Sequence, residues 1–135
     1  MSKFGCKCGH VIVDQTDLLP YKAGLLRDQV EETFWDGFLG KIKDFLIAAK
    51  PKDIAALIAS GGGESAPQTN AADNLVDQLS GVQARELSTV YECEGCGRLW
   101  FETYAGAGFI SYVPEGGKYH AILSIAPGES GNRDA

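Results

Sequence analysis

Four cysteines in two close pairs, one near each end of the chain, constrain this sequence more than any other feature. Cys6 and Cys8 form the first pair, and Cys93 and Cys96 form the second. Four thiolate sulfurs are a ligand set that Zn²⁺ takes in structural tetrahedral sites. One ion bound by both pairs would join distant parts of the chain and fix the fold around them.

The second pair fits a metal-binding turn more fully than the first. Its sequence is C-E-G-C-G over residues 93–97. The final glycine can adopt a positive φ, which lets backbone N–H groups point at the sulfurs. The first pair, C-K-C-G over residues 6–9, has one residue fewer between its cysteines, so its turn must differ in geometry.

A short internal repeat follows both pairs. Residues 8–14 (CGHVIVD) align with residues 96–102 (CGRLWFE). Each copy has Cys, Gly, a basic residue or His, three apolar residues and an acid. The repeat predicts two similar units, each a cysteine turn that leads into a strand.

These residues resemble the zinc-ribbon (rubredoxin-like knuckle) class over about residues 4–14 and 91–125. The sequence departs from small ribbons in its short first turn and in the long stretch between the pairs. The resemblance implies a structural Zn²⁺ and an antiparallel ribbon-like sheet. It also implies four metal ligands: Cys6, Cys8, Cys93 and Cys96.

Other interpretations of the cysteines remain open. Iron in a rubredoxin-like site is the redox alternative, a disulfide is another, and four unrelated buried thiols are the plainest. A thioredoxin-like role for the second pair would need a helix after it, whereas the sequence predicts a strand. His10 is the rival ligand, although Arg98 takes its place in the second copy. His120 lies in a predicted strand and is expected to be a surface or hydrogen-bonded side chain.

The middle of the chain predicts helices. Thr16 or Asp17 could cap a first one, with Pro20 in its first turn. Apolar residues recur at helical spacing over 26–46, with a kink or break expected at Gly37 or Gly40. The remaining predicted helices are one begun by Pro51 and ended by the glycines at 61–63, and one capped by Asn70 and ended by Gly81.

The flanking regions predict short strands. These cover residues 10–14, 87–92, 98–104, 109–113 and 119–125, with a hairpin connection at 114–118. Residues 61–69 are expected to be a flexible loop, and residues 127–135 a disordered tail. The predicted fold is α+β: one zinc-stabilised domain over 1–126, with an antiparallel zinc-ribbon-like sheet and a mostly helical insertion over 17–80.

The charge and hydropathy of the chain disfavour some classes of function. The chain has 12 basic and 18 acidic side chains, a net charge of −6. This balance disfavours a protein that mainly binds phosphate backbones. No apolar run approaches the roughly 20 residues of a membrane span. The first residues lack the apolar stretch of a secretory signal, so we expect a cytoplasmic protein that does not act at a membrane.

These features predict a non-catalytic protein, not an enzyme. The predicted function is a zinc-stabilised adaptor whose acidic surface binds a protein partner. One concrete form is an immunity-type protein that neutralises a basic toxin. Trp35, which lies off the main apolar face of its helix, is the candidate partner-binding residue. The alternatives are a nucleic-acid-associated zinc ribbon and a small enzyme whose site has no recognisable motif.

Overall fold

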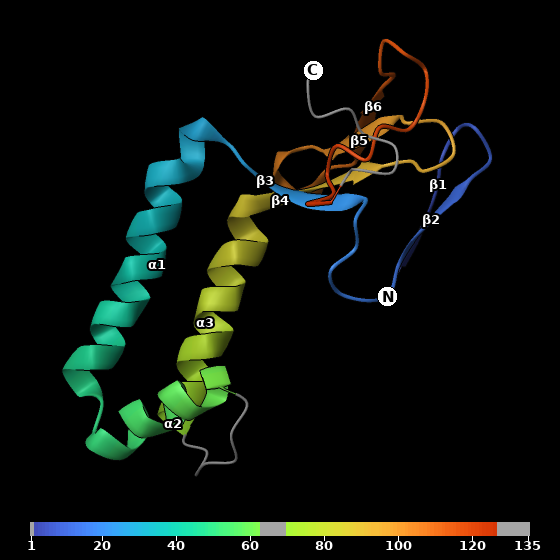
Figure 1. Ribbon diagram of the computed structural model, residues 1–135. Coiled ribbons are helices and arrows are strands. Elements are labelled where there is room, and N and C mark those ends of the chain that lie inside the picture. Colours follow the sequence, from blue (N-terminus) through green and yellow to red (C-terminus); the bar gives the residue numbers. More distant parts are fainter. Residues whose placement is uncertain (1, 63–69, 127–135) are drawn as a thin grey trace. The chain divides into compact units, whose positions relative to one another are not determined.

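A computed structural model describes residues 2–62 and 70–126, without the side chains of 60–62 (Figure 1). The chain forms two compact units. One contains the residues up to Leu25 and those from Ser88 onward, and the other runs from Leu26 to Leu87. The predicted tail (127–135) and most of the predicted loop (63–69) lie outside the described residues.

The first unit is built from antiparallel strands. A hairpin of β1 (Ser2–Gly5) and β2 (Val11–Asp14) carries the first cysteine pair in its turn. The other sheet has the order β3-β4-β5-β6, in which β5 pairs antiparallel with both its neighbours. Its strands are β3 (Lys22–Leu26), β4 (Leu87–Glu92), β5 (Leu99–Glu102) and β6 (Phe109–Tyr112).

An aromatic core joins the hairpin to the larger sheet. Ile12, Tyr91 and Trp100 are buried together with Cys6 and Cys93. Burial of side chains of this size contributes about 1.5–3 kcal/mol each to stability. The ring of Phe4, from β1, packs edge-on against two rings of the sheet, those of Trp100 at 4.9 Å and Phe109 at 4.7 Å.

Asp14 ties β2 to two strands of the sheet. The Tyr91 hydroxyl donates a hydrogen bond to its carboxylate at 2.6 Å, and the Lys22 ammonium lies 2.8 Å from the same oxygen. Hydrogen bonding from Lys22, and then from Tyr91, lowers the pKa of Asp14. Burial and the hydrogen bond to Asp14 raise the pKa of Tyr91 to about 12.

The predicted helix that starts at Thr16 or Asp17 is wrong. Residues 15–21 form a loop, and β3 follows directly. Leu18 has φ +62°, a value outside the right-handed helical region, and its side chain is 99% exposed. The Glu92 N–H donates to the Tyr21 carbonyl at 2.9 Å, next to the β3–β4 pair. Pairing with β4 thus determines the conformation of this segment, which a local capping pattern could not reveal.

The predicted strand over 119–125 is also wrong. Its backbone does not pair with a strand but binds the carboxylate of Glu92, which is 1% exposed. The N–H groups of His120 and Ile122 donate to the two carboxylate oxygens at 3.0 and 2.9 Å. The predicted hairpin connection at 114–118 is a turn, in which the Gly117 N–H donates to the Pro114 carbonyl, but it joins no hairpin because residues 119–125 are not a strand.

The second unit consists of α1 (Asp28–Ala48), α2 (Pro51–Gly62) and α3 (Asn70–Glu86). Together with the sheets, these helices confirm the α+β class. Pro51 begins α2 as predicted, and the Lys50 N–H is capped by the Asp53 carboxylate at 3.0 Å.

The glycines interrupt the helices less than predicted. α1 passes through Gly37 and Gly40 without a break and α3 continues past Gly81, whereas α2 extends to Gly62, within the glycine run predicted to end it. A glycine inside a helix costs up to about 1 kcal/mol, which packing can offset. A Cβ placed on Gly37 would lie 3.8 Å from Val82, so α1 approaches α3 closely at this point.

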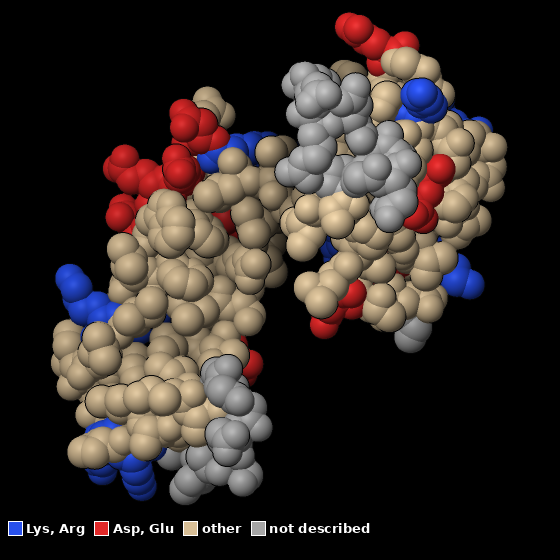
Figure 2. All heavy atoms as spheres, viewed as in Figure 1, with Lys and Arg blue, Asp and Glu red and all other residues tan. Residues whose placement is uncertain are grey.

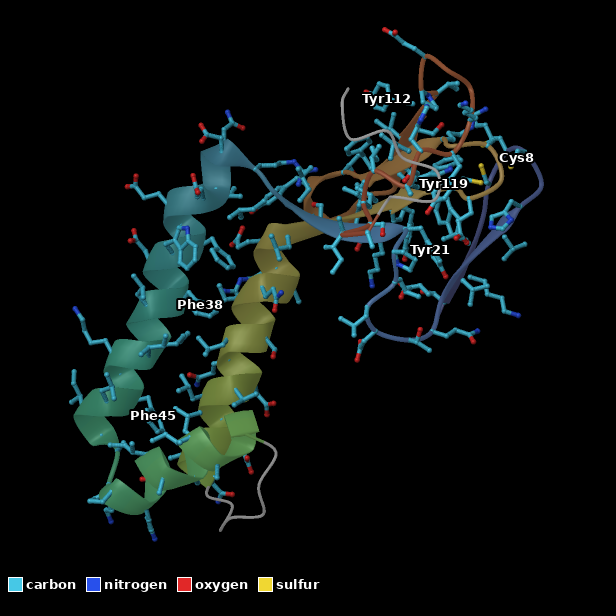
Figure 3. The ribbon with its side chains drawn as sticks, in the orientation of Figure 1. Cys8, Tyr21, Phe38, Phe45, Tyr112 and Tyr119 are labelled. Carbon is cyan, nitrogen blue, oxygen red and sulfur yellow. The ribbon has the colours of Figure 1, made fainter. Side chains whose placement is uncertain are left out.

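Tertiary packing stabilises the helical unit. α1 and α3 lie side by side, and α2 also packs against α3 (Figure 1). Phe34 and Phe45 of α1 are buried, as are Leu75 and Val82 of α3. Figure 3 shows Phe38 and Phe45 on the side of α1 that faces α3. In the part of the chain that the structure describes, no helix is both long enough and apolar enough to cross a bilayer.

Replacing Asp14 by Asn should remove a pH-dependent part of the stability. Because the pKa of Asp14 is lowered in the folded chain, its contribution is complete above the unfolded value of about 3.9 and is lost as the pH falls through the folded pKa. We expect Asp14→Asn to lower the free energy of unfolding at neutral pH by about 1 kcal/mol. Urea unfolding at several pH values measures this difference.

The difference between the parent chain and Asp14→Asn should shrink as the pH falls below about 4. The control is Asp17→Asn, since Asp17 is an exposed carboxylate in the following loop. A loss for Asp14→Asn that stays constant with pH would contradict the assignment.

Candidate metal centre

The four cysteine sulfurs meet in one cluster. Their Sγ atoms all lie within 4.8 Å of one another. The Cys6 and Cys96 sulfurs are 3.7 Å apart, and those of Cys8 and Cys93 are 3.5 Å apart. Sulfurs at about 2.3 Å from a tetrahedral Zn²⁺ lie about 3.8 Å from each other. The cluster could therefore hold one metal ion between two cysteine pairs from distant parts of the sequence.

Two similar turns position the sulfurs. In the first, the Cys6 N–H donates to the His10 carbonyl at 2.9 Å and the Gly9 N–H donates to the Cys6 carbonyl at 3.0 Å. In the second, the Cys93 N–H donates to the Arg98 carbonyl at 2.9 Å, and the Gly97 N–H donates to the Cys93 carbonyl at 2.7 Å. The internal repeat thus corresponds to a repeated hydrogen-bond pattern.

The two turns differ by one residue, as their sequences predict. The first closes with a β-turn bond, whereas the second closes with the longer bond of an α-turn. Both end in a glycine with positive φ, which is +99° at Gly9 and +82° at Gly97. Glycine adopts this conformation without the steric cost that a Cβ would bring.

N–H groups of the backbone and of one side chain donate to the sulfurs. The indole N–H of Trp100 donates to the Cys6 sulfur at 3.4 Å, and the Gly95 N–H donates to the Cys93 sulfur at 3.3 Å. Such donors stabilise thiolate charge and orient metal ligands. Sequence analysis missed Trp100, although the repeat aligns it with Ile12. Both residues are buried in the core beside the cysteines. The alignment of Trp100 with Ile12 in the repeat was therefore the sequence feature that could have indicated its position.

The thiols differ in how readily they ionise. Burial favours the neutral form of Cys6, but hydrogen bonds from the Cys8 backbone and from Trp100 outweigh it and lower its pKa to about 6. Burial raises the pKa of Cys93 to about 12, and the sulfurs of Cys8 and Cys6 add to this effect. Burial likewise raises the pKa of Cys96. Four thiolates this close repel one another unless a cation lies among them, so the cluster suits a metal dication.

The cluster is buried on one side and open on the other. Cys93 is fully buried and Cys6 nearly so, while Cys96 is half-buried and Cys8 is exposed. Figure 3 labels Cys8 beside the sulfur atoms of the cluster. A metal held here would therefore be reachable from solvent past Cys8.

Among the described residues, His10 is not part of the four-sulfur cluster. Its carbonyl accepts a hydrogen bond within the first turn instead. The cysteines are free thiols, and the closest sulfur distance of 3.5 Å far exceeds the roughly 2.05 Å of a disulfide. The chain after the second turn enters β5, which excludes the helix of a thioredoxin-like site.

A later segment of the chain passes directly over the second turn. A Cβ built on Gly97 would lie 2.1 Å from the carbonyl oxygen of Lys118. This separation leaves room only for glycine. The segment that Glu92 holds therefore also covers the turn that presents Cys93 and Cys96.

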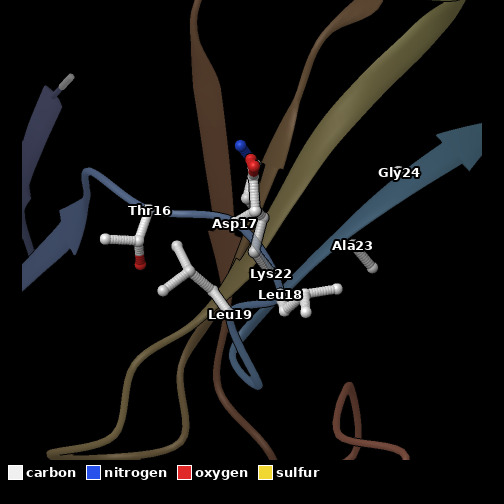
Figure 4. A pocket seen from close by; sticks show the side chains of 7 residues that line it. All are labelled: Thr16, Asp17, Leu18, Leu19, Lys22, Ala23 and Gly24. Carbon is white, nitrogen blue, oxygen red and sulfur yellow. The ribbon is translucent and has the colours of Figure 1, made fainter. Parts of the chain in front are cut away.

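The remaining candidate features lie elsewhere. Trp35 lies on α1 and is 47% exposed, with its ring against those of Phe34 and Phe38. A pocket of about 250 Å³ lies in the loop between β2 and β3 (Figure 4). It is smaller than the roughly 300–1,000 Å³ typical of small-molecule sites. Its lysine, Lys22, is already engaged by Asp14.

Adding a methyl group to each turn glycine should separate backbone strain from steric overlap. Gly9 has a positive φ but open space around it, whereas Gly97 has both the positive φ and the contact with Lys118. We expect Gly9→Ala to lower the free energy of unfolding by about 1 kcal/mol and Gly97→Ala by about 3 kcal/mol or more. Chemical unfolding of the two variants measures this. Equal losses would mean that the segment around Lys118 does not cover the second turn.

Comparison with known proteins gives one informative match. No curated protein and no solved structure matched the chain. The model of one family, described as "Domain of unknown function (DUF8617)", matches residues 2–116, which include both cysteine pairs and the helices between them. The chain belongs to this family.

Proposed function

We propose that this is a non-catalytic protein in which Cys6, Cys8, Cys93 and Cys96 hold one structural Zn²⁺. The observation that supports the proposal is the convergence of four sulfurs within 4.8 Å of one another. Four protein ligands fill a tetrahedral ion, so no position stays open for water or substrate. Catalytic zinc sites keep such a position, and the ligand set therefore favours a structural role.

Zinc suits the cluster better than iron does. Zn²⁺ has no redox chemistry and accepts tetrahedral sulfur ligands without a further geometric demand. The exposed side of the cluster at Cys8 would leave a redox-active iron in contact with solvent. Iron is the second candidate for the same four ligands.

The metal would have a large effect on folding. An ion that joins Cys8 to Cys93 closes a loop containing the whole helical unit. Loop-closure scaling gives a stabilisation of about 4 kcal/mol for a loop of this length. The stability of a modest domain is itself about 5–15 kcal/mol. We therefore propose that the first unit depends on the metal for its fold.

Removing one ligand should release the metal and destabilise the chain. We expect about one zinc ion per purified chain, a lower unfolding temperature after chelation, and loss of zinc in Cys93→Ser and Cys96→Ser. Elemental analysis and thermal unfolding measure these quantities.

The matched control is His10→Ala, which alters the first turn but leaves the four sulfurs in place and should retain zinc. Reduced protein that binds no zinc would contradict the proposal. If the purified protein contains stoichiometric iron and absorbs visible light, the bound metal is iron and not zinc.

We further propose that the protein is an adaptor and that its helical unit binds a protein partner. Large apolar side chains are exposed on α1, including Trp35 at 47%, Leu39 at 58% and Ile47 at 78%. Exposed apolar groups gathered on one element favour a protein interaction surface. The net charge of −6 would favour a basic partner, as for an immunity-type protein.

A nucleic-acid-associated ribbon is the alternative function. Its phosphate contacts would need an excess of Lys and Arg, whereas the chain has 12 basic and 18 acidic side chains. We expect zinc-loaded protein to pass through heparin and DNA columns at low salt without retention. Retention that falls steeply with added salt would favour the nucleic-acid alternative and contradict the adaptor.

A further inference from the structure

α1 carries two apolar faces, and among the described residues of the helical unit only the first is buried by packing. Phe34 and Phe45 are buried on the first face. The second face is an apolar row of four side chains at alternating spacings of four and three residues. Its members are Trp35 (47% exposed), Leu39 (58%), Ile42 (half-buried) and Leu46 (59%). This spacing is that of helices which pack against each other along their length.

Charge is distributed unevenly along the same helix. The charged side chains of its first half, from Asp28 to Asp36, are all acidic, whereas its second half carries Lys41 and Lys43 beside a single acid, Asp44. Figure 2 shows red side chains gathered at the amino-terminal end of α1 and blue ones towards its other end. Two copies aligned in parallel would bring the acidic halves together, whereas an antiparallel pair would bring each acidic half against a basic one.

We propose that the apolar row docks against the same row of a second copy of this chain, with the two α1 helices antiparallel. A twofold axis would pair Trp35 with Leu46 of the second copy, and Leu39 with Ile42 of the second copy. This proposal rests on the proposed function and concerns the apolar row alone: a second copy occupies the row, while the basic partner proposed above would bind the acidic surface.

Two side chains beside the apolar row specify this direction. Asp36 follows Trp35 and Lys43 follows Ile42, so both flank the row on the same side of the helix. In the antiparallel pair, Asp36 lies next to Lys43 of the second copy, and symmetry produces this contact twice. In a parallel pair Asp36 and Lys43 would not meet. Charge complementarity therefore favours a second copy in one defined orientation.

The mass of the zinc-loaded full chain in solution tests the proposal. Sedimentation velocity over a wide range of concentrations at low salt should show a dimer that salt weakens. Leu39→Lys should give a monomer with unchanged helix content, since Leu39 is exposed in the single chain. Zinc content is measured on the same samples, so that loss of the metal, which concerns the proposed function, is distinguished from loss of the dimer.

Charge reversal tests the orientation. Asp36→Lys and Lys43→Glu should each weaken dimerisation by about tenfold, because each places like charges in contact. The double variant should restore it, because exchange of the two charges recreates both contacts. The matched control is Asp44→Lys, an exposed position whose helical angle places it on the side of α1 away from the apolar row, which should leave the dimer unchanged.

Three outcomes would overturn the proposal. If the zinc-loaded, helical chain stays monomeric at all concentrations, a second copy does not bind the apolar row. A dimer that survives Leu39→Lys would use a different surface. A dimer that the double variant fails to restore would have another orientation.

Discussion

The meeting of two cysteine pairs at one point is the constraint on which the sheet unit depends. The first pair lies in a hairpin of few residues, and a hairpin of that size is marginal alone. It is held against the larger sheet by the sulfur cluster, by the aromatic contacts of Phe4 and by the Asp14–Tyr91 hydrogen bond. Among these contacts, the cluster is the one that requires an additional group, because four thiolate sulfurs at this distance repel one another unless a cation lies among them. The proposed zinc would thus complete a set of contacts that the chain has already brought together.

The helical unit is stabilised by a different kind of interaction. Its stability comes from apolar packing between α1 and α3, with Phe34 and Phe45 on one side and Leu75 and Val82 on the other. One of its polar contacts begins a helix, where the Asp53 carboxylate accepts a hydrogen bond from the Lys50 N–H. The sulfur cluster and the proposed interaction surface thus belong to different units. One unit would provide the metal-dependent fold, and the other would provide the apolar and charged row that a second copy recognises.

Local patterns in the sequence were sufficient for some elements and not for others. The strand at 87–92 and the first residue of α2 were predicted correctly, because β-branched residues and Pro51 act locally. The breaks expected at Gly37 and Gly40 were wrong, because packing on α3 offsets a cost of about 1 kcal/mol. The helix expected at Asp17 and the strand expected at 119–125 failed for non-local reasons, namely pairing of β3 with β4 and capture of backbone N–H groups by Glu92. At the cluster, cysteine spacing predicted the sulfurs, but the Trp100 donor depends on how distant strands are placed together.

The position of Glu92 has a consequence for how much of the chain the fold requires. This carboxylate directly precedes Cys93, and its two hydrogen-bond donors belong to His120 and Ile122. The match to the family ends at residue 116, before both donors. A fragment cut at that boundary would keep β1 to β6 yet lose both donors to Glu92, together with the segment that passes over the second cysteine turn. A version of this protein that keeps the contacts around Glu92 and Cys93 therefore extends through Ile122, past the last described strand.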